Sequence, residues 1–150
     1  MADLEPSRLH AEALVALAAA RLTVLGAALT VYADQVPRDP SYPYAVFWST
    51  PAMPYAPAER MAGWGQDVET VTQATVAGLA RADVIGGVDR LALALHRRKP
   101  TIAGRTVGDC ELDGAPAAPV RDPVPAPDGA EVWTTPVFFR LASSPITNAE

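Results

Sequence analysis

The chain has 150 residues and a formal net charge of −5, with 49% hydrophobic and 19% charged residues. This composition excludes a wholly disordered chain, and the length predicts one domain that spans residues 1–150. The acidic balance argues against a protein that grips nucleic-acid phosphates, because such proteins display a basic surface. A signal-peptide pattern and a transmembrane run are both missing from the sequence, so we expect a soluble product of the cytoplasm.

The first third of the chain predicts a helix followed by two strands. Residues 6–22 form the helix, because Leu14, Leu17 and Ala18 fall on one face. Residues 29–33 are rich in β-branched and aromatic side chains and predict a strand. Three prolines in residues 34–43 then favour a turn. Residues 44–50 predict a second strand with two apolar faces, which is typical of a strand covered on both sides or meeting a partner.

A long loop, residues 51–65, precedes the clearest strand. The loop carries Met53, Tyr55 and Trp64, and these side chains are too apolar for a purely solvated connection. Loops of this length without structure are usually functional or mobile. Residues 66–77 then alternate strictly between two faces, which predicts a strand.

The second helix is predicted over residues 81–97. Its apolar residues Val84, Val88, Leu91 and Leu95 are spaced 4, 3 and 4 apart, which places them in one buried stripe. Gly86 and Gly87 weaken a helix, so they mark a place of close packing against a neighbour. Residues 106–113 predict the next strand.

The last part of the chain combines a proline-rich segment with a final strand. Five prolines in Gly114–Ala130 favour extended, semi-rigid backbone, and we expect a protruding arm that is mobile in the free monomer. Residues 133–142 predict a fifth strand, in which Pro136 forces a bulge or an edge position. Residues 145–150 are expected to be a flexible tail.

The predicted order is helix, three strands, helix and two strands. It indicates an α+β fold, a single domain in which a mixed or antiparallel β-sheet carries two helices on one face.

The sequence contains no recognisable catalytic, cofactor or metal motif. His10 and His96 have no second ligand at helical spacing, which favours ordinary surface residues over metal ligands. Cys110 is the only cysteine, and packing in a strand is the favoured role. The basic cluster Arg97–Lys99 is typical of a solvated helix end. We therefore expect no enzyme and no cofactor.

The order and spacing of several short motifs resemble a known family, the siphophage tail terminators. In the first half the similar motifs are Val31-Tyr32-Ala33, Val36-Pro37 and Tyr42-Pro43-Tyr44. In the second half they are the strand–helix pair over residues 68–95, the segment from Pro100 to Gly108 and the aromatic strand over residues 132–141. The resemblance covers roughly residues 5 to 145, and each motif is a marker of fold, not of chemistry.

The resemblance implies a structural virion protein in the neck region of the tail. Such proteins form a ring, expected to be a hexamer, on the end of a finished tail tube. The ring stops polymerisation of the major tail tube protein and presents a surface to the head-tail connector or stopper protein. DNA passes through the lumen without specific binding, which the acidic charge favours. A membrane has no part in this role.

Interface residues are expected in the loop and in the arm. Aromatic side chains dominate interface energetics, so Tyr55 and Trp64, with Met53, are candidate anchors in the loop. In the arm, Val120 and Val124 are candidate docked side chains, and Arg121 is a candidate rim charge.

Two other functions fit the same pattern. The first is another neck component, such as a head-completion or stopper protein, which has a similar small fold. The second is a small cellular ligand-binding α+β domain, which the lack of a catalytic motif in the sequence disfavours. A ring in negative-stain microscopy supports the neck proteins, whereas a compact monomer supports the cellular domain.

Overall fold

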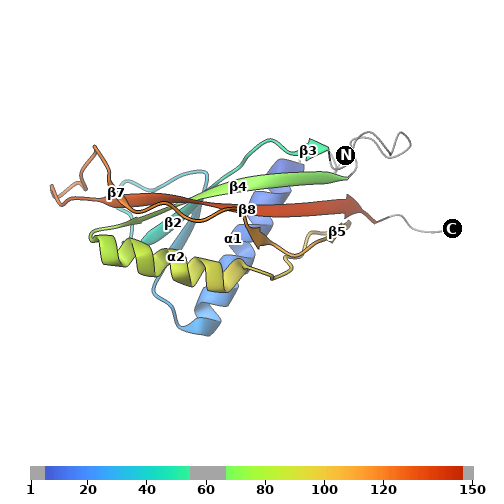
Figure 1. The fold of residues 1–150 in the computed structure, drawn as a ribbon, viewed down its shortest axis with the longest axis horizontal. Coiled ribbons are helices and arrows are strands. Elements are labelled where there is room, and N and C mark those ends of the chain that lie inside the picture. Colours follow the sequence, from blue (N-terminus) through green and yellow to red (C-terminus); the bar gives the residue numbers. More distant parts are fainter. Residues whose placement is uncertain (1–5, 55–66, 147–150) are drawn as a thin grey trace.

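Two helices cover one face of a mixed β-sheet (Figure 1). The computed structural model describes residues 6–54 and 67–146. Their elements, in chain order, are α1 (Pro6–Leu25), β1 (Thr30–Ala33), β2 (Tyr44–Trp48), β3 (Met53–Pro54), β4 (Val68–Gly78), α2 (Arg81–Leu95), β5 (Arg105–Val107), β6 (Glu111–Leu112), β7 (Val120–Arg121) and β8 (Trp133–Pro145). The predicted α+β fold with both helices on one face is confirmed.

The sheet is built around two long antiparallel strands, β4 and β8. The strand order is β1-β2-β4-β8-β5. The short strand β3 pairs with β4, and β6 and β7 pair with β8. Only the β1–β2 pair is parallel among the described strands, so the sheet is mixed.

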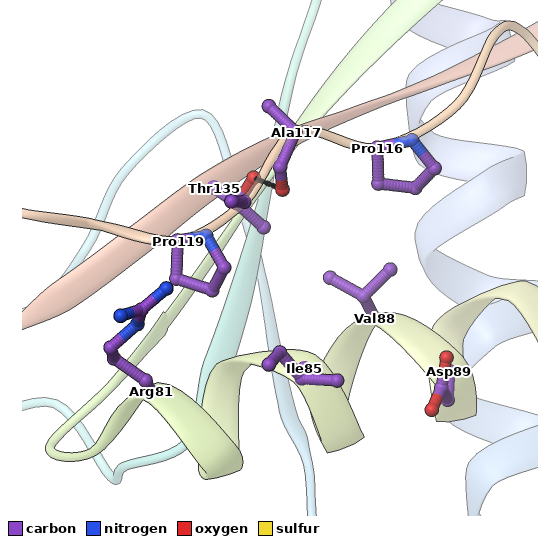
Figure 2. A pocket seen from close by; sticks show the side chains of 9 residues that line it. Arg81, Ile85, Val88, Asp89, Pro116, Ala117, Pro119 and Thr135 are labelled. Atoms are coloured by element: carbon purple, nitrogen blue, oxygen red, sulfur yellow. Dashed lines mark hydrogen bonds between the residues drawn. The ribbon is translucent and has the colours of Figure 1, made fainter.

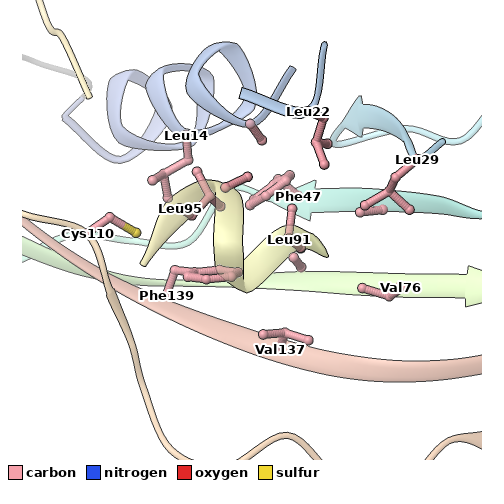
Figure 3. Packing of buried hydrophobic residues seen from close by; sticks show 14 of the residues in the cluster. Leu14, Leu22, Leu29, Phe47, Val76, Leu91, Leu95, Cys110, Val137 and Phe139 are labelled. Carbon is pink, nitrogen blue, oxygen red and sulfur yellow. The ribbon is translucent and has the colours of Figure 1, made fainter. Parts of the chain in front are cut away.

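Alternation along the strands separates a helix-covered face from an uncovered one. Phe47 pairs with Ala74, and Ala74 pairs with Val137, so these three side chains share the covered face. Phe139 lies one row further along the same face, and its ring centroid is 6.2 Å from that of Phe47. The helices contribute the other half of the core (Figure 3), mainly through Leu14, Leu22, Val84, Leu91 and Leu95.

The predicted stripe of α2 is confirmed, but the helix ends earlier than expected. Val84, Val88, Leu91 and Leu95 are all buried against the sheet and α1. The helix ends at Leu95, not at Arg97, because the backbone of His96 is extended, with φ −62° and ψ 128°, and Arg97 then adopts a positive φ of 59°. Arg98 N–H then donates to the Leu95 carbonyl at 3.0 Å, which closes the last turn.

Gly87 marks the close approach that the glycine pair predicted, whereas Gly86 does not. A Cβ on Gly87 would lie 2.9 Å from Val76 Cγ1 and 3.4 Å from Leu29 Cδ1. A Cβ on Gly86 would meet only the end of the Arg90 side chain, at 3.8 Å. The helix therefore packs directly onto β4 at Gly87.

The two glycines form a matched pair for substitution. We expect Gly86→Ala to raise the free energy of unfolding by about 0.5–1 kcal/mol, because it removes backbone freedom from the unfolded chain. Gly87→Ala should lower it, because the stiff Val76 side chain must shift. Urea denaturation of the two variants measures both changes. Equal stabilisation by both would contradict the close packing of α2 on β4.

Several predicted boundaries of the strands need correction. The strand expected over residues 106–113 is two short strands, β5 and β6, separated by Gly108, Asp109 and Cys110. Pro136 forces no bulge, because β8 pairs with β4 in one unbroken register from Trp133 to Ser143. Its other edge lacks a strand partner between Thr134 and Phe139 in the described part, and proline is tolerated at such an edge.

The end of the chain is more ordered than a flexible tail from residue 145. Pro145 belongs to β8 and pairs with Arg105. Ile146 N–H donates to the Gly104 carbonyl at 2.9 Å. Residues 147–150 of the predicted tail lie outside the described residues.

Candidate functional site

The predicted loop anchors are only partly within the described structure. Tyr55 and Trp64, and most of the loop 51–65, lie outside the described residues. The backbone of Met53 begins β3 and pairs with Glu69 of β4. The expected contacts of the loop therefore stay a prediction.

The sequence suggested that the proline-rich arm protrudes from the body, but in the structure the arm is docked along β8. Val120 and Arg121 form β7 and pair with Thr134 and Trp133. Thr135 Oγ1 donates to the Ala117 carbonyl at 2.7 Å. The pairing of β7 with β8 uses backbone groups and needs no side-chain pattern, which is why the prolines alone suggested free extension.

Residues 121–131, which we name the acidic tip, start at the last residue of β7 and lie at one end of the molecule (Figure 1). Asp122 Oδ1 accepts from the Val124 N–H at 2.9 Å, and Asp128 Oδ1 accepts from the Ala130 N–H at 3.0 Å. Ala126 N–H donates to the Ala130 carbonyl at 2.9 Å, which closes the turn. Hydrogen bonds therefore hold the backbone of the tip in a defined turn.

The side chains of the candidate interface residues of the arm are exposed to solvent. Val120 is 61% exposed and Val124 is 70% exposed. Arg121 pairs with Glu131 at 3.0 Å, and both side chains are exposed, so this ion pair contributes little to stability. The structure therefore places Val120, Arg121 and Val124 at one end of the molecule. The two valines are exposed apolar side chains there, and Arg121 is an exposed charge beside them.

A shallow groove of about 450 Å³ runs between α2 and the first half of the arm (Figure 2). Its floor and walls are mostly apolar, and Ile85 is half exposed along one side. The lining residues are Arg81, Ile85, Val88, Asp89, Pro116, Ala117, Ala118, Pro119 and Thr135. No sequence pattern predicted this groove, because the arm is held beside α2 by contacts with β8 that are distant in the sequence.

The uncovered face of the sheet carries a cross-strand row that the sequence predicted only in part. Trp48 pairs with Gln73, and Gln73 pairs with Phe138, so the three side chains lie side by side on this face. Trp48 and Phe138 are 37% and 38% exposed. Trp48 Nε1 donates to Thr75 Oγ1 at 3.0 Å. The two apolar faces predicted for residues 44–50 were the signal for Trp48, whereas Phe138 had none.

His10 is a buried residue, and the expectation of a surface histidine is wrong for it. Its side chain is 0% exposed. Nδ1 lies 2.7 Å from Thr70 Oγ1, and Nε2 lies 2.6 Å from Ser143 Oγ. Arg105 Nε donates to Ser143 Oγ at 2.8 Å. This buried polar cluster joins α1 to β4, β5 and β8.

Burial, with a smaller contribution from the Arg105 guanidinium, lowers the pKa of His10 to about 4. The imidazole is therefore neutral at pH 7, with one ring nitrogen as donor and the other as acceptor. His96 is exposed, and its Nδ1 accepts from the Leu112 N–H at 3.1 Å. No group of His, Cys, Asp and Glu in the described ranges is placed to hold a metal ion.

Cys110 packs in the core, as the sequence predicted. It is completely buried, and burial, with a smaller contribution from Glu111, raises the pKa of its thiol to about 12. Such a thiol is unreactive at neutral pH.

The segment after α2, Arg97–Lys99, forms an exposed turn that we name the basic turn. Arg97 N–H donates to the Cys110 carbonyl, and Cys110 N–H donates to the Arg98 carbonyl, both at 2.7 Å. All three cationic side chains are exposed. The prediction of solvated charges at a helix end agrees with this exposure.

Comparison with known proteins adds a fold relationship. No protein-family model and no curated protein matches the chain. Among the described residues, no helix is long and apolar enough to cross a membrane. A solved structure described as "Virion of native gene transfer agent (GTA) particle" contains a chain with a similar fold. The TM-score is 0.54 at 15% identity, and the match covers 83% of this chain and 84% of that one, which relates the two folds.

Proposed function

We propose that this chain is a structural protein of a phage-like virion, a tail terminator. In this role it forms a ring, a hexamer, on the end of the tail tube. The ring stops polymerisation of the tube protein and joins the tail to the head's connector or stopper protein. It has no catalytic activity, and DNA passes through its lumen without specific binding.

The observation that carries the proposal is the fold shared with a chain of a gene transfer agent virion over four-fifths of both chains. A virion particle is an assembly, and a chain of it needs surfaces that bind other chains. The present chain has such surfaces in the apolar row of Trp48 and Phe138 and in the exposed Val120 and Val124. The order of sequence motifs that resembles the tail terminators gives the finer role.

The electrostatics of the chain are consistent with a channel for DNA. The formal charge of −5 on each subunit gives a ring a strongly negative field. Such a field repels the phosphate backbone and keeps the genome from adhering to the lumen. A protein that held DNA would instead present a basic stripe.

Capping of tail tubes tests the proposed function. The purified chain is added to the polymerising tail tube protein of the same particle, and tube lengths are measured by negative-stain microscopy. We expect shorter tubes with a gold-labelled chain at one end only. Label along the tube, or unchanged lengths without label, would count against a terminator. A ring that binds the connector but not the tube would point to another neck protein.

A further inference from the structure

The acidic tip of the arm presents charge and apolar surface at one end of the molecule. Asp122, Asp128 and Glu131 oppose a single cation, Arg121, so the tip carries a formal charge of −2. Val124 projects beside these charges and is 70% exposed. The prolines and turn hydrogen bonds fix the backbone, which lowers the entropy lost when the tip docks.

The basic turn presents the opposite charge. Arg97, Arg98 and Lys99 carry a formal charge of +3, and within the part of the chain that the structure describes none of them forms an ion pair. One helical turn earlier Leu93 is 63% exposed. The turn therefore combines unpaired positive charge with an exposed apolar side chain, as a complement to the tip.

The two surfaces lie at opposite ends of α2 and cannot satisfy each other within one molecule. The N-terminal end of α2 is next to the arm, where the Arg81 guanidinium lies 5.5 Å from the centroid of the Trp133 ring. The basic turn follows the C-terminal end of this helix, 15 residues or roughly 22 Å away (Figure 1). Complementary surfaces on opposite sides of a subunit are what a head-to-tail ring requires.

We infer that the acidic tip of one copy docks on the basic turn of the next copy, with Val124 packed against Leu93. This inference rests on the proposed function, since it supplies the contact that closes the ring. The carboxylates of Asp122 and Asp128 each keep one oxygen outside the turn hydrogen bonds, and these oxygens face the cations of the neighbour. Because exposed charges steer the encounter, the contact weakens as salt is added.

Cross-linking between engineered cysteines tests this contact even when the association is weak. The variants Val124→Cys and Leu93→Cys are mixed and treated with a short bis-maleimide. The buried Cys110 does not compete, because its thiol stays protonated. The control pair is Val124→Cys with Val24→Cys. Val24 lies outside both surfaces but is more exposed than Leu93, so random collision alone would favour the control. We expect the pair of Val124→Cys with Leu93→Cys to cross-link faster than this control. Equal rates would overturn the inference.

A chain that carries both substitutions reports the symmetry of the contact. A head-to-tail contact links Val124→Cys of each copy to Leu93→Cys of the next, so the products form a ladder that stops at the closed ring. A two-fold contact would stop at the dimer, and that result would overturn the head-to-tail arrangement.

Charge substitutions separate specific docking from random collision. Arg98→Glu should slow the cross-linking at low salt by about tenfold or more, whereas Arg98→Lys, which keeps the positive charge at the same place, should not. Asp128→Asn removes charge from the tip while its amide oxygen keeps the hydrogen bond to Ala130, and it should slow the reaction as well. Equal effects of Arg98→Glu and Arg98→Lys would contradict the docking.

The inference and the proposed function fail in different ways. Rings that cap tubes but resist cross-linking between Val124→Cys and Leu93→Cys would leave the terminator role in place and exclude this contact. Cross-linked ladders that never associate with tubes would support the contact and exclude the terminator role.

Discussion

Lowering the pH from 7 to 4 is expected to reduce the free energy of unfolding by about 3 kcal/mol through His10 alone. The pKa of His10 is about 4 in the folded chain, against 6.5 for an unperturbed histidine. The folded state therefore disfavours the protonated ring, and each unit of pKa difference corresponds to about 1.4 kcal/mol. This stabilisation is complete above pH 6.5 and is lost as the pH falls from 6.5 towards 4.

The structural reason is the crowded position of the imidazole between Thr70 and Ser143. Protonation places a second positive charge near Arg105, whose Nε already donates to Ser143 Oγ. The charged ring would also be completely buried, which is costly for a charge without a counter-ion. Protonation of His10 therefore weakens the contact of α1 with β4 and β8.

Urea denaturation of the wild-type chain and of His10→Gln at several pH values isolates this effect. Glutamine keeps a donor and an acceptor but does not titrate, so it removes the contribution of His10 and retains that of the carboxyl groups. The stability advantage of the wild type should shrink by about 3 kcal/mol between pH 7 and pH 4. Parallel pH profiles for the two proteins would show that His10 is protonated as easily in the folded chain as in the unfolded one.

Phe139→Ala should destabilise the chain by about 3–5 kcal/mol, whereas Phe138→Ala should change its stability by about 1 kcal/mol or less. Phe139 is completely buried between the helices and the sheet and packs against Phe47. Its neighbour Phe138 points to the uncovered face and is 38% exposed. Truncation opens a cavity in the first case and only trims the surface in the second.

Thermal denaturation of the two variants measures the contrast. For a chain of this length, 3–5 kcal/mol corresponds to a decrease in Tm of roughly 10 °C. Phe138→Ala should melt close to the wild type, which makes it a matched control on the same strand. A similar loss of Tm in both variants would mean that the second face of the sheet is also covered within the free subunit.

Regular hydrophobic spacing made most of the fold predictable. The stripe of Val84, Val88, Leu91 and Leu95 and the alternation of residues 68–77 both report local geometry, so the sequence alone located α2 and β4. The short strands β3 and β7 were missed because each is two residues long and depends on a partner strand rather than on its own pattern.

The candidate site was less predictable, because its parts are assembled by distant pairings. The sequence suggested Val120, Arg121 and Val124 as candidate interface residues from the proline-rich context, but their positions depend on the pairing of β7 with β8. The partners of His10 lie 60 and 133 residues further along the chain, so no local signal marked its burial. The basic turn was predicted as a charged helix end, and its place opposite the acidic tip emerged only from the fold.

The number and position of copies in the assembled particle test the proposed role most directly. Electron microscopy of intact particles, with the chain identified by a fused density tag, locates it along the tail. The terminator role predicts a closed ring of six copies at the end of the tube that faces the head. A single copy per tail, or copies distributed along the tube or in the head shell, would contradict it.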